Sequence, residues 1–217
     1  MLPFATIETR WFFDGESGHH PALRHWFETC ESFPRGADVG APRWTGRAGG
    51  APDIYLLMPG CSDMGIKWRE GMLQIKGRVE DLGTRHMGTR HRGRVQRWIK
   101  WTYYEVSAAY RSLFSSGGTH GLATAAVHKT RALRMISLDA GKPVEVVPGA
   151  VLQRGVGYEM TDLEVDGKRC CSIAFEAFPD DAAAASGFDA VVTGFLDELP
   201  VSLDAGASMS YPEWLST

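Results

Sequence analysis

The alternation of hydrophobic and polar residues predicts a chain built mainly from β-strands. Segments 4–13 and 64–69 place apolar side chains at every second position, which is the period of a strand with one buried face. The same pattern predicts further strands at about 53–58, 72–81, 95–103, 123–136, 156–166 and 169–178. These eight strands mostly follow one another along the chain, so we expect them to pair antiparallel.

Three stretches instead show helical spacing of their apolar residues. We expect helices over 21–33, 106–113 and 180–199, the last capped by Asp180 or Asp181 and ended by Pro200. Segments 34–52 and 115–121 are rich in residues that favour loops. The sequence therefore predicts an α+β protein with a single domain over residues 1–200, ending in a helix, and a tail over 201–217.

Composition and charge describe an ordinary soluble domain. Hydrophobic residues make up 44% of the 217 positions and charged residues 23%, and the net charge of -3 points to no special partner. The four cysteines, at positions 30, 61, 170 and 171, have no CxxC spacing. The beginning of the chain does not resemble a signal peptide, and no apolar run approaches about 18 residues. We expect a cytoplasmic protein with reduced thiols and no contact with a membrane.

A hairpin with a tight turn at Glu70-Gly71 carries an unusual basic face. Alternation places Lys67 and Arg69 on one side of the first strand, and Lys76 and Arg78 share a side of the returning strand. Four converging cations repel one another unless water, carboxylates or a bound anion neutralises them. A solvated hairpin face is the simpler interpretation, but the same spacing recurs at Lys129 and Arg131.

Eight antiparallel strands can close into a barrel, which removes exposed edges and brings alternate residues of every strand together. We expect a closed or nearly closed eight-stranded barrel with helices packed outside. Its inward-facing charged residues would be Glu8, Arg10, Lys67, Arg69, Lys76, Arg78, Lys129, Arg131, Glu159 and Glu176. A cation-rich interior with a few carboxylates predicts a site for a small anion, with room for a divalent metal.

The order of these motifs resembles that of the CYTH-type triphosphate tunnel metalloenzymes, over roughly residues 4–180. Thr6-Ile7-Glu8-Thr9-Arg10 stands where the family has Glu-x-Glu-x-Lys. The basic hairpin, the pair Lys129-Thr130-Arg131 and the strand Ala174-Phe175-Glu176 are similar to the family's later motifs. Thr6 and Ala174 depart from the pattern by replacing acids, and Arg10 replaces a lysine.

The resemblance implies metal-dependent hydrolysis or phosphoryl transfer on inorganic triphosphate, thiamine triphosphate or a nucleoside triphosphate. It implies that Mg²⁺ or Mn²⁺ is held by Glu8, Glu159 and Glu176, with Glu8 and Lys129 catalytic. The phosphates would be bound by Arg10, Lys67, Arg69, Lys76, Arg78, Lys129 and Arg131. Because two acids of the family pattern are missing, a non-catalytic barrel that binds a phosphorylated or other anionic small molecule is the alternative.

Segment 82–104 adds a second basic feature, with no acid among its residues. Its cations are Arg85, Arg90, Arg92, Arg94, Arg97 and Lys100. We expect a flexible, solvated loop here, while a lid over the barrel mouth and a surface for RNA or DNA are alternatives. A small anion rather than nucleic acid is the partner we expect. The sequence leaves the oligomeric state open, with a dimer as one option.

Overall fold

A computed structural model describes residues 3–15, 19–46, 50–114 and 123–217. Its strands are β1 (Phe4–Asp14), β2 (Trp44–Thr45), β3 (Asp53–Leu56), β4 (Met64–Arg69), β5 (Met72–Met87), β6 (His91–Tyr103), β7 (Thr124–Ser137), β8 (Val144–Val146), β9 (Gly155–Val165) and β10 (Lys168–Phe178). Its helices are α1 (His20–Thr29), α2 (Ala108–Ser112), α3 (Ala182–Leu196), the 3₁₀ turn η1 (Ala205–Ala207) and α4 (Tyr211–Trp214).

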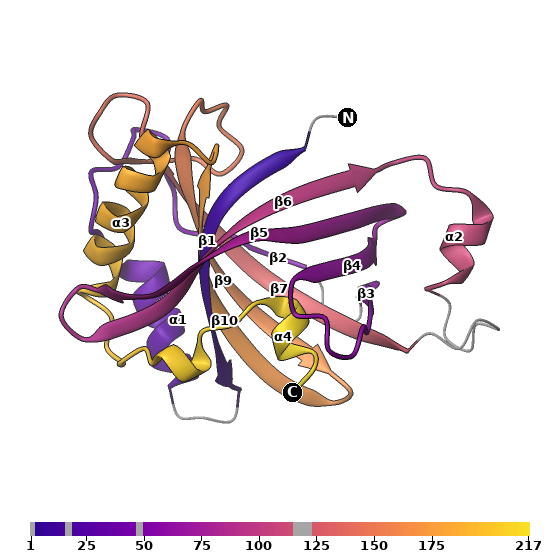
Figure 1. Ribbon diagram of the computed structural model, residues 1–217. Coiled ribbons are helices and arrows are strands. Elements are labelled where there is room, and N and C mark those ends of the chain that lie inside the picture. Colours follow the sequence, from indigo (N-terminus) through magenta and orange to yellow (C-terminus); the bar gives the residue numbers. More distant parts are fainter. Residues whose placement is uncertain (1–2, 16–18, 47–49, 115–122) are drawn as a thin grey trace.

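The strands form a closed antiparallel barrel, as the alternation predicted (Figure 1). Eight strands run around it in the order β7, β3, β4, β5, β6, β1, β10 and β9, and β9 pairs again with β7. The short strands β2 and β8 add to the edges of β7. The predicted turn joins β4 to β5, where Glu70 and Gly71 both take positive φ angles of 49° and 82°. Two successive positive φ angles suit a tight hairpin turn.

The part of segment 82–104 that precedes the predicted strand over 95–103 is not a loop, so the prediction of a loop there was wrong. β5 and β6 continue through it as one long hairpin, with irregularities in register between Arg78 and Glu80 and again after Asp81. The hairpin is stabilised by acids outside the segment. Arg97 contacts both Glu80 and Asp180, at 2.5 and 3.0 Å. Glu80 lies on β5 just before the segment, whereas Asp180 lies two residues before α3 and is distant in the sequence.

The main hydrophobic core lies outside the barrel, between its wall and helices α1 and α3. Alternation on β1 turns Ile7 and Trp11 outward, where both are buried. On the neighbouring strands Tyr158 and Phe175 stack with ring centroids 4.6 Å apart. Phe195 of α3 packs on both rings. Figure 1 shows α1 and α3 on the same side of the barrel, which leaves its interior to polar residues.

The C-terminal segment packs into one end of the barrel. The backbone N–H of Met209 donates to the carbonyl of Arg10 on β1. Trp214 stacks on Phe12 at 4.7 Å, and Tyr211 stacks on Tyr55 at 5.7 Å. The tail over 201–217 is therefore anchored to the barrel through Tyr211 and Trp214. Among the described residues, no helix is both long enough and apolar enough to cross a membrane.

Candidate functional site

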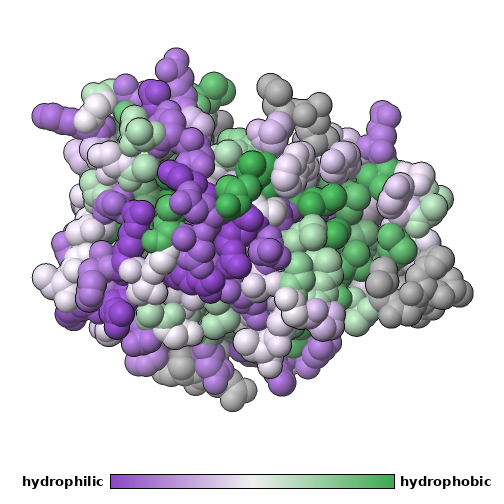
Figure 2. All heavy atoms as spheres, in the orientation of Figure 1, coloured by the Kyte–Doolittle hydropathy of each residue, from purple (hydrophilic) through white to green (hydrophobic). Residues whose placement is uncertain are grey.

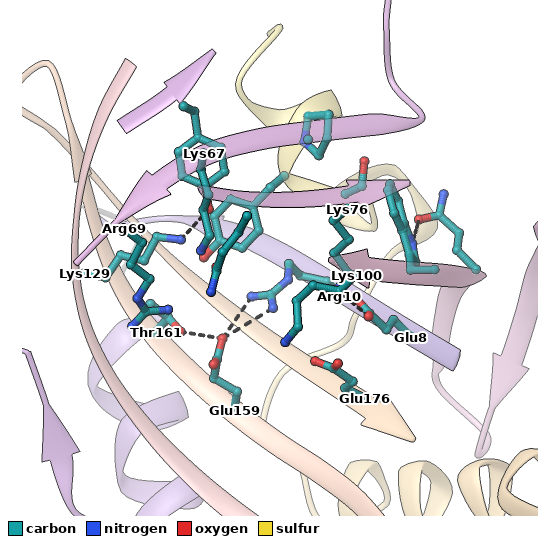
Figure 3. Close-up of a pocket in the computed structure, with 18 of the residues that line it drawn as sticks. Glu8, Arg10, Lys67, Arg69, Lys76, Lys100, Lys129, Glu159, Thr161 and Glu176 are labelled. Atoms are coloured by element: carbon teal, nitrogen blue, oxygen red, sulfur yellow. Dashed lines mark hydrogen bonds and ion pairs between the residues drawn. The ribbon is translucent and has the colours of Figure 1, made fainter. Parts of the chain in front are cut away.

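A cavity of about 400 Å³ occupies the barrel interior (Figure 3). Its lining includes eight cations, Arg10, Lys67, Arg69, Lys76, Arg94, Lys100, Lys129 and Arg131, and four acids, Glu8, Glu70, Glu159 and Glu176. These charged residues come from seven of the eight barrel strands and from the β4–β5 turn, and residues 209–212 at the start of α4 complete the lining. Figure 2 shows hydrophilic side chains gathered near the middle of the face seen in Figure 1, with hydrophobic ones more toward α2. The fold and cavity define a barrel with a cationic interior.

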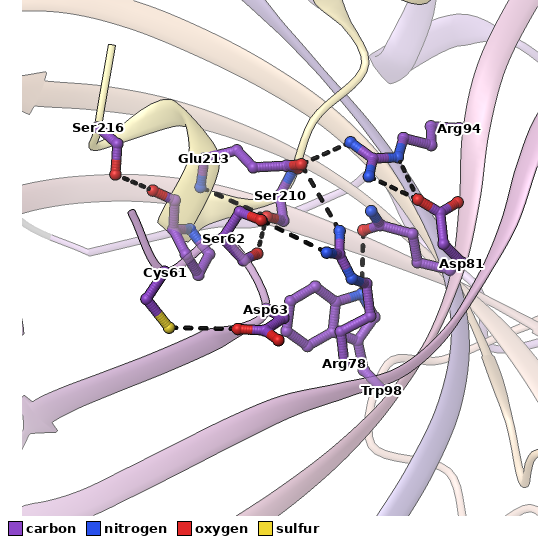
Figure 4. Close-up of polar contacts among 12 residues, drawn as sticks. Cys61, Ser62, Asp63, Arg78, Asp81, Arg94, Trp98, Ser210, Glu213 and Ser216 are labelled. Carbon is purple, nitrogen blue, oxygen red and sulfur yellow. Dashed lines mark hydrogen bonds and ion pairs between the residues drawn. The ribbon is translucent and has the colours of Figure 1, made fainter. Parts of the chain in front are cut away.

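The structure brings nine of the ten predicted site residues to this cavity. Arg78 is the exception, and the expectation that it lines the same space was wrong. Its guanidinium lies 3.6 Å from Glu213 and donates to Ser62 at 3.4 Å (Figure 4). Glu213 also binds Arg94 at 2.5 Å. Arg78 therefore helps to hold the C-terminal segment, whose approach to β5 could not be read from strand alternation.

Asp53, which the sequence pattern did not single out, binds three of the cavity's cations. Its Oδ2 lies 2.9 Å from Lys67 Nζ and 3.2 Å from Lys129 Nζ, and its Oδ1 lies 3.5 Å from Arg69 Nε. Lys129 also donates to the hydroxyl of Tyr55 at 2.7 Å. The available signal was alternation, because Asp53 and Tyr55 share the inward side of β3.

Burial makes these lysines easier to deprotonate. Burial, together with the positive charge of Lys129, lowers the pKa of Lys67 to about 7. Burial likewise lowers the pKa of Lys129 to about 8, although Asp53 opposes the change. Burial also opposes the charge of Asp53, but Lys129 and Lys67 outweigh it and hold the pKa of Asp53 below its usual value. Lys67 and Lys129 therefore give up their protons more easily than exposed lysines do.

Glu159 lies between two arginines. Arg10 and Arg131 each approach it to 3.3 Å, and Thr161 donates to it at 2.9 Å. Burial opposes its charge, but the arginines outweigh burial and lower the pKa of Glu159 to about 2. Arg10 also donates to Ser172 at 2.9 Å. Glu159 is thus a carboxylate already satisfied by protein cations.

Glu8 and Glu176 form the most acidic part of the cavity. They are direct neighbours across the β1–β10 pairing. Glu8 contacts Lys76 and accepts from the hydroxyl of Thr6, so Thr6 and Glu8 share the inward side of β1. Burial and the charge of Glu8 raise the pKa of Glu176. Lys76 and Lys100 both oppose this rise, because they favour the charged form of Glu176.

The three predicted metal ligands do not form one cluster. Among the described residues, no group of three or more His, Cys, Asp or Glu side chains is arranged to hold a metal ion. Glu159 is occupied by arginines and does not fit a metal site. By themselves, Glu8 and Glu176 fit a metal site with two protein ligands. Mg²⁺ commonly takes one or two protein carboxylates and completes its shell with water and phosphate oxygens.

The C-terminal segment supplies Tyr211 to the lining, which also includes the aromatic side chains of Tyr55 and Trp98. The ring of Tyr211 lies 3.9 Å from Lys129 Nζ and 4.7 Å from the guanidinium carbon of Arg10. Such contacts favour the charged form of the cation. Burial raises the pKa of Tyr211 to about 12. In the sequence, Ser210-x-x-Glu213 marks the start of this element, where it forms a capping box.

Comparisons with known proteins identify no family. No protein-family profile and no curated protein matches the chain. Two solved structures are similar over nearly their whole length. A conserved hypothetical protein from Pyrococcus furiosus is 13% identical, with 96% of this chain and 98% of that one covered and a TM-score of 0.45. A protein from Pyrococcus horikoshii is 18% identical, with 97% of each chain covered and a TM-score of 0.43.

Proposed function

We propose that the barrel binds a small molecule carrying a triphosphate or a similar chain of phosphates. The observation that carries this proposal is the convergence of eight cations on one cavity of about 400 Å³, against five carboxylates when Asp53 is included. Charge-assisted bonds from lysine and arginine to phosphate oxygens are among the stronger polar contacts in proteins. A cavity of this size accommodates an anion larger than a single phosphate.

The reaction that we propose is metal-dependent hydrolysis or phosphoryl transfer, as in the triphosphate tunnel metalloenzymes that the sequence resembles. Glu8 and Glu176 would hold Mg²⁺ or Mn²⁺, which would supply charge neutralisation and activation of water. Lys129, Lys67 and the cavity's arginines would bind and orient the phosphates and offset the charge that develops during transfer.

A non-catalytic anion-binding barrel is the second candidate. The observation in its favour is that Glu159 is satisfied by two arginines and that Glu8 is paired with Lys76. Carboxylates used in this way neutralise cations when the cavity is empty. In that case their role is to stabilise the buried cations of the barrel rather than to take part in catalysis.

Calorimetry with tripolyphosphate tests the binding proposal. Arg69→Ala and Lys129→Ala each remove a charge-assisted contact, so affinity should fall about tenfold to a hundredfold. Arg85→Ala is the matched control, because Arg85 lies on the outer hairpin in an exposed pair with Asp189. Undiminished binding in both cavity variants would refute the proposal that the anion binds in this cavity.

Phosphate release separates the two candidates. Tripolyphosphate, ATP and thiamine triphosphate should each be tested with Mg²⁺, with Mn²⁺ and with excess chelator. An enzyme of the proposed kind should lose turnover in Glu8→Gln and should bind metal more tightly in Thr6→Glu, because Thr6 contacts Glu8. Binding without phosphate release under every metal condition supports the non-catalytic barrel. Full activity in chelator refutes the metal assignment.

A further inference from the structure

Asp53 differs from the four carboxylates of the cavity because its own side chain is not part of the lining. Its partners Lys67, Arg69 and Lys129 line the cavity, whereas the Asp53 side chain is only 8% exposed. Both lysine Nζ atoms contact the same oxygen, Oδ2. The two ammonium groups are therefore no more than about 6 Å apart, where like charges repel strongly in a partly buried site.

A phosphate oxygen in the cavity would approach the same N–H groups from the other side. Lys67 and Lys129 are flexible side chains with three donors each, so they can keep one contact with Asp53 and turn others to a ligand. Arg69 is held at a longer distance of 3.5 Å from Asp53 and has more donors available. The three cations thus have a protein anion on one side and the cavity on the other.

We propose that Asp53 is a positioning residue that keeps Lys67 and Lys129 charged and holds them, together with Arg69, in place in the empty barrel, so that it sets the pH range over which the cavity binds anions. This inference rests on the proposed function, because it concerns the same anion site. It assigns a role to a residue that touches the cations rather than the ligand.

The surroundings of the two lysines support this role. The charged and titratable groups near them are Asp53 and Tyr55 from β3, Arg69 from β4, Arg10 from β1, Glu159 from β9 and Tyr211 of α4. Asp53 is the carboxylate in direct contact with both lysines. Burial lowers the pKa of Lys67 to about 7 even with Asp53 present. Without Asp53, the two lysines should lose a proton more easily still.

The test is the pH dependence of tripolyphosphate binding in Asp53→Asn, measured by calorimetry from pH 5.5 to 9. At the acidic end both lysines can be protonated and a repulsive carboxylate is gone, so the variant should bind about tenfold tighter than the wild type. Between about pH 7 and 8 the wild-type lysines still carry part of their charge, whereas those of the variant should already be neutral, so the variant should bind several-fold more weakly there. The two curves should cross. The titration of the ligand itself is common to both proteins and cancels.

Asp189→Asn is the matched control, since it makes the same charge change on the exposed face of α3. It should follow the wild-type curve. Asp53→Glu keeps the charge and should restore most of the wild-type profile. An Asp53→Asn curve that is parallel to the wild type, whether equal or uniformly weaker, would overturn the proposal, because a purely structural role changes affinity by the same factor at every pH.

Direct titration of the lysines by NMR gives a readout that needs no ligand. The pKa of Lys67 should fall in Asp53→Asn and rise in Lys129→Gln, which removes a like charge. Lys129→Gln also serves if Asp53→Asn does not fold. Unchanged titration of Lys67 in the folded variants would refute the role of Asp53. If the wild type binds no tripolyphosphate at any pH, the proposed function fails, while the lysine titration still decides whether Asp53 controls these charges.

Discussion

Replacing Glu159 by glutamine should make the protein less stable in a strongly pH-dependent way. Glutamine keeps the shape of the side chain but removes the charge that Arg10 and Arg131 share. The pKa of Glu159 is about 2 in the folded chain against an ordinary value of 4.5. At 1.36 kcal/mol for each pKa unit, this difference corresponds to about 3 kcal/mol of stability.

The sign follows from the lowered pKa. The unfolded chain takes up a proton on Glu159 at about pH 4.5, whereas the folded chain resists protonation down to about pH 2. The stabilisation by Glu159 is therefore complete well above pH 4.5 and is lost as the pH falls from about 4.5 to about 2. Near pH 7 the variant should unfold about 6–12 °C below the wild type, given a chain of this length.

Urea denaturation at several pH values between 7 and 3 measures this effect. The difference in unfolding free energy between the wild type and Glu159→Gln should shrink steadily as the pH falls below 4.5. Glu164→Gln is the control, because Glu164 lies on the same strand but is exposed on its outer side, and it should change little. A difference that stays constant down to pH 3 would refute the reasoning, because it would mean that glutamine disturbs packing rather than charge.

Two further predictions concern the walls of the barrel. Gly93→Ala should destabilise the protein by about 3 kcal/mol, because the added Cβ would lie 2.2 Å from the buried ring of Trp11. Gly40→Ala, with nothing within 4 Å of its added Cβ, is the control in thermal denaturation. Equal melting temperatures of the two variants would contradict a steric clash at Gly93. Trp214→Ala should cost about 2 kcal/mol in urea denaturation by removing the stack on Phe12, and an unchanged midpoint would show that α4 contributes little to closing the barrel.

The barrel could be predicted because its strands obey a simple local rule. On β1 the outward Ile7 and Trp11 alternate with the inward Glu8 and Arg10, and a shift of one residue would reverse all four. The same rule correctly placed Lys67 and Lys129 inside the barrel. Alternation needs no knowledge of distant partners, so a single sequence suffices for it.

The parts that the sequence missed depend on contacts between distant segments. The strands of the long hairpin are held through Arg97 by Asp180, which lies 83 positions further along the chain. Arg78 is drawn away from the cavity by Glu213 at the other end of the chain. Alternation places Asp53 on the inward side of β3, but its pairing with Lys67, Arg69 and Lys129 depends on β4 and β7 lying beside that strand. Charge pairing of this kind leaves no periodic signal in the sequence.

The placement of the core outside the barrel has a consequence for local unfolding. Strands β9 and β10 are mostly buried, whereas β4 has no fully buried residue and β5 has one, Met87. Free energies of local opening follow such differences in burial. Amides of β9 and β10 should therefore exchange with solvent slowly and those of β4 quickly. Lys67 lies on the easily opened β4 and Arg10 on the better buried β1, so an anion bound by both cations would connect the two parts of the barrel and slow exchange in β4.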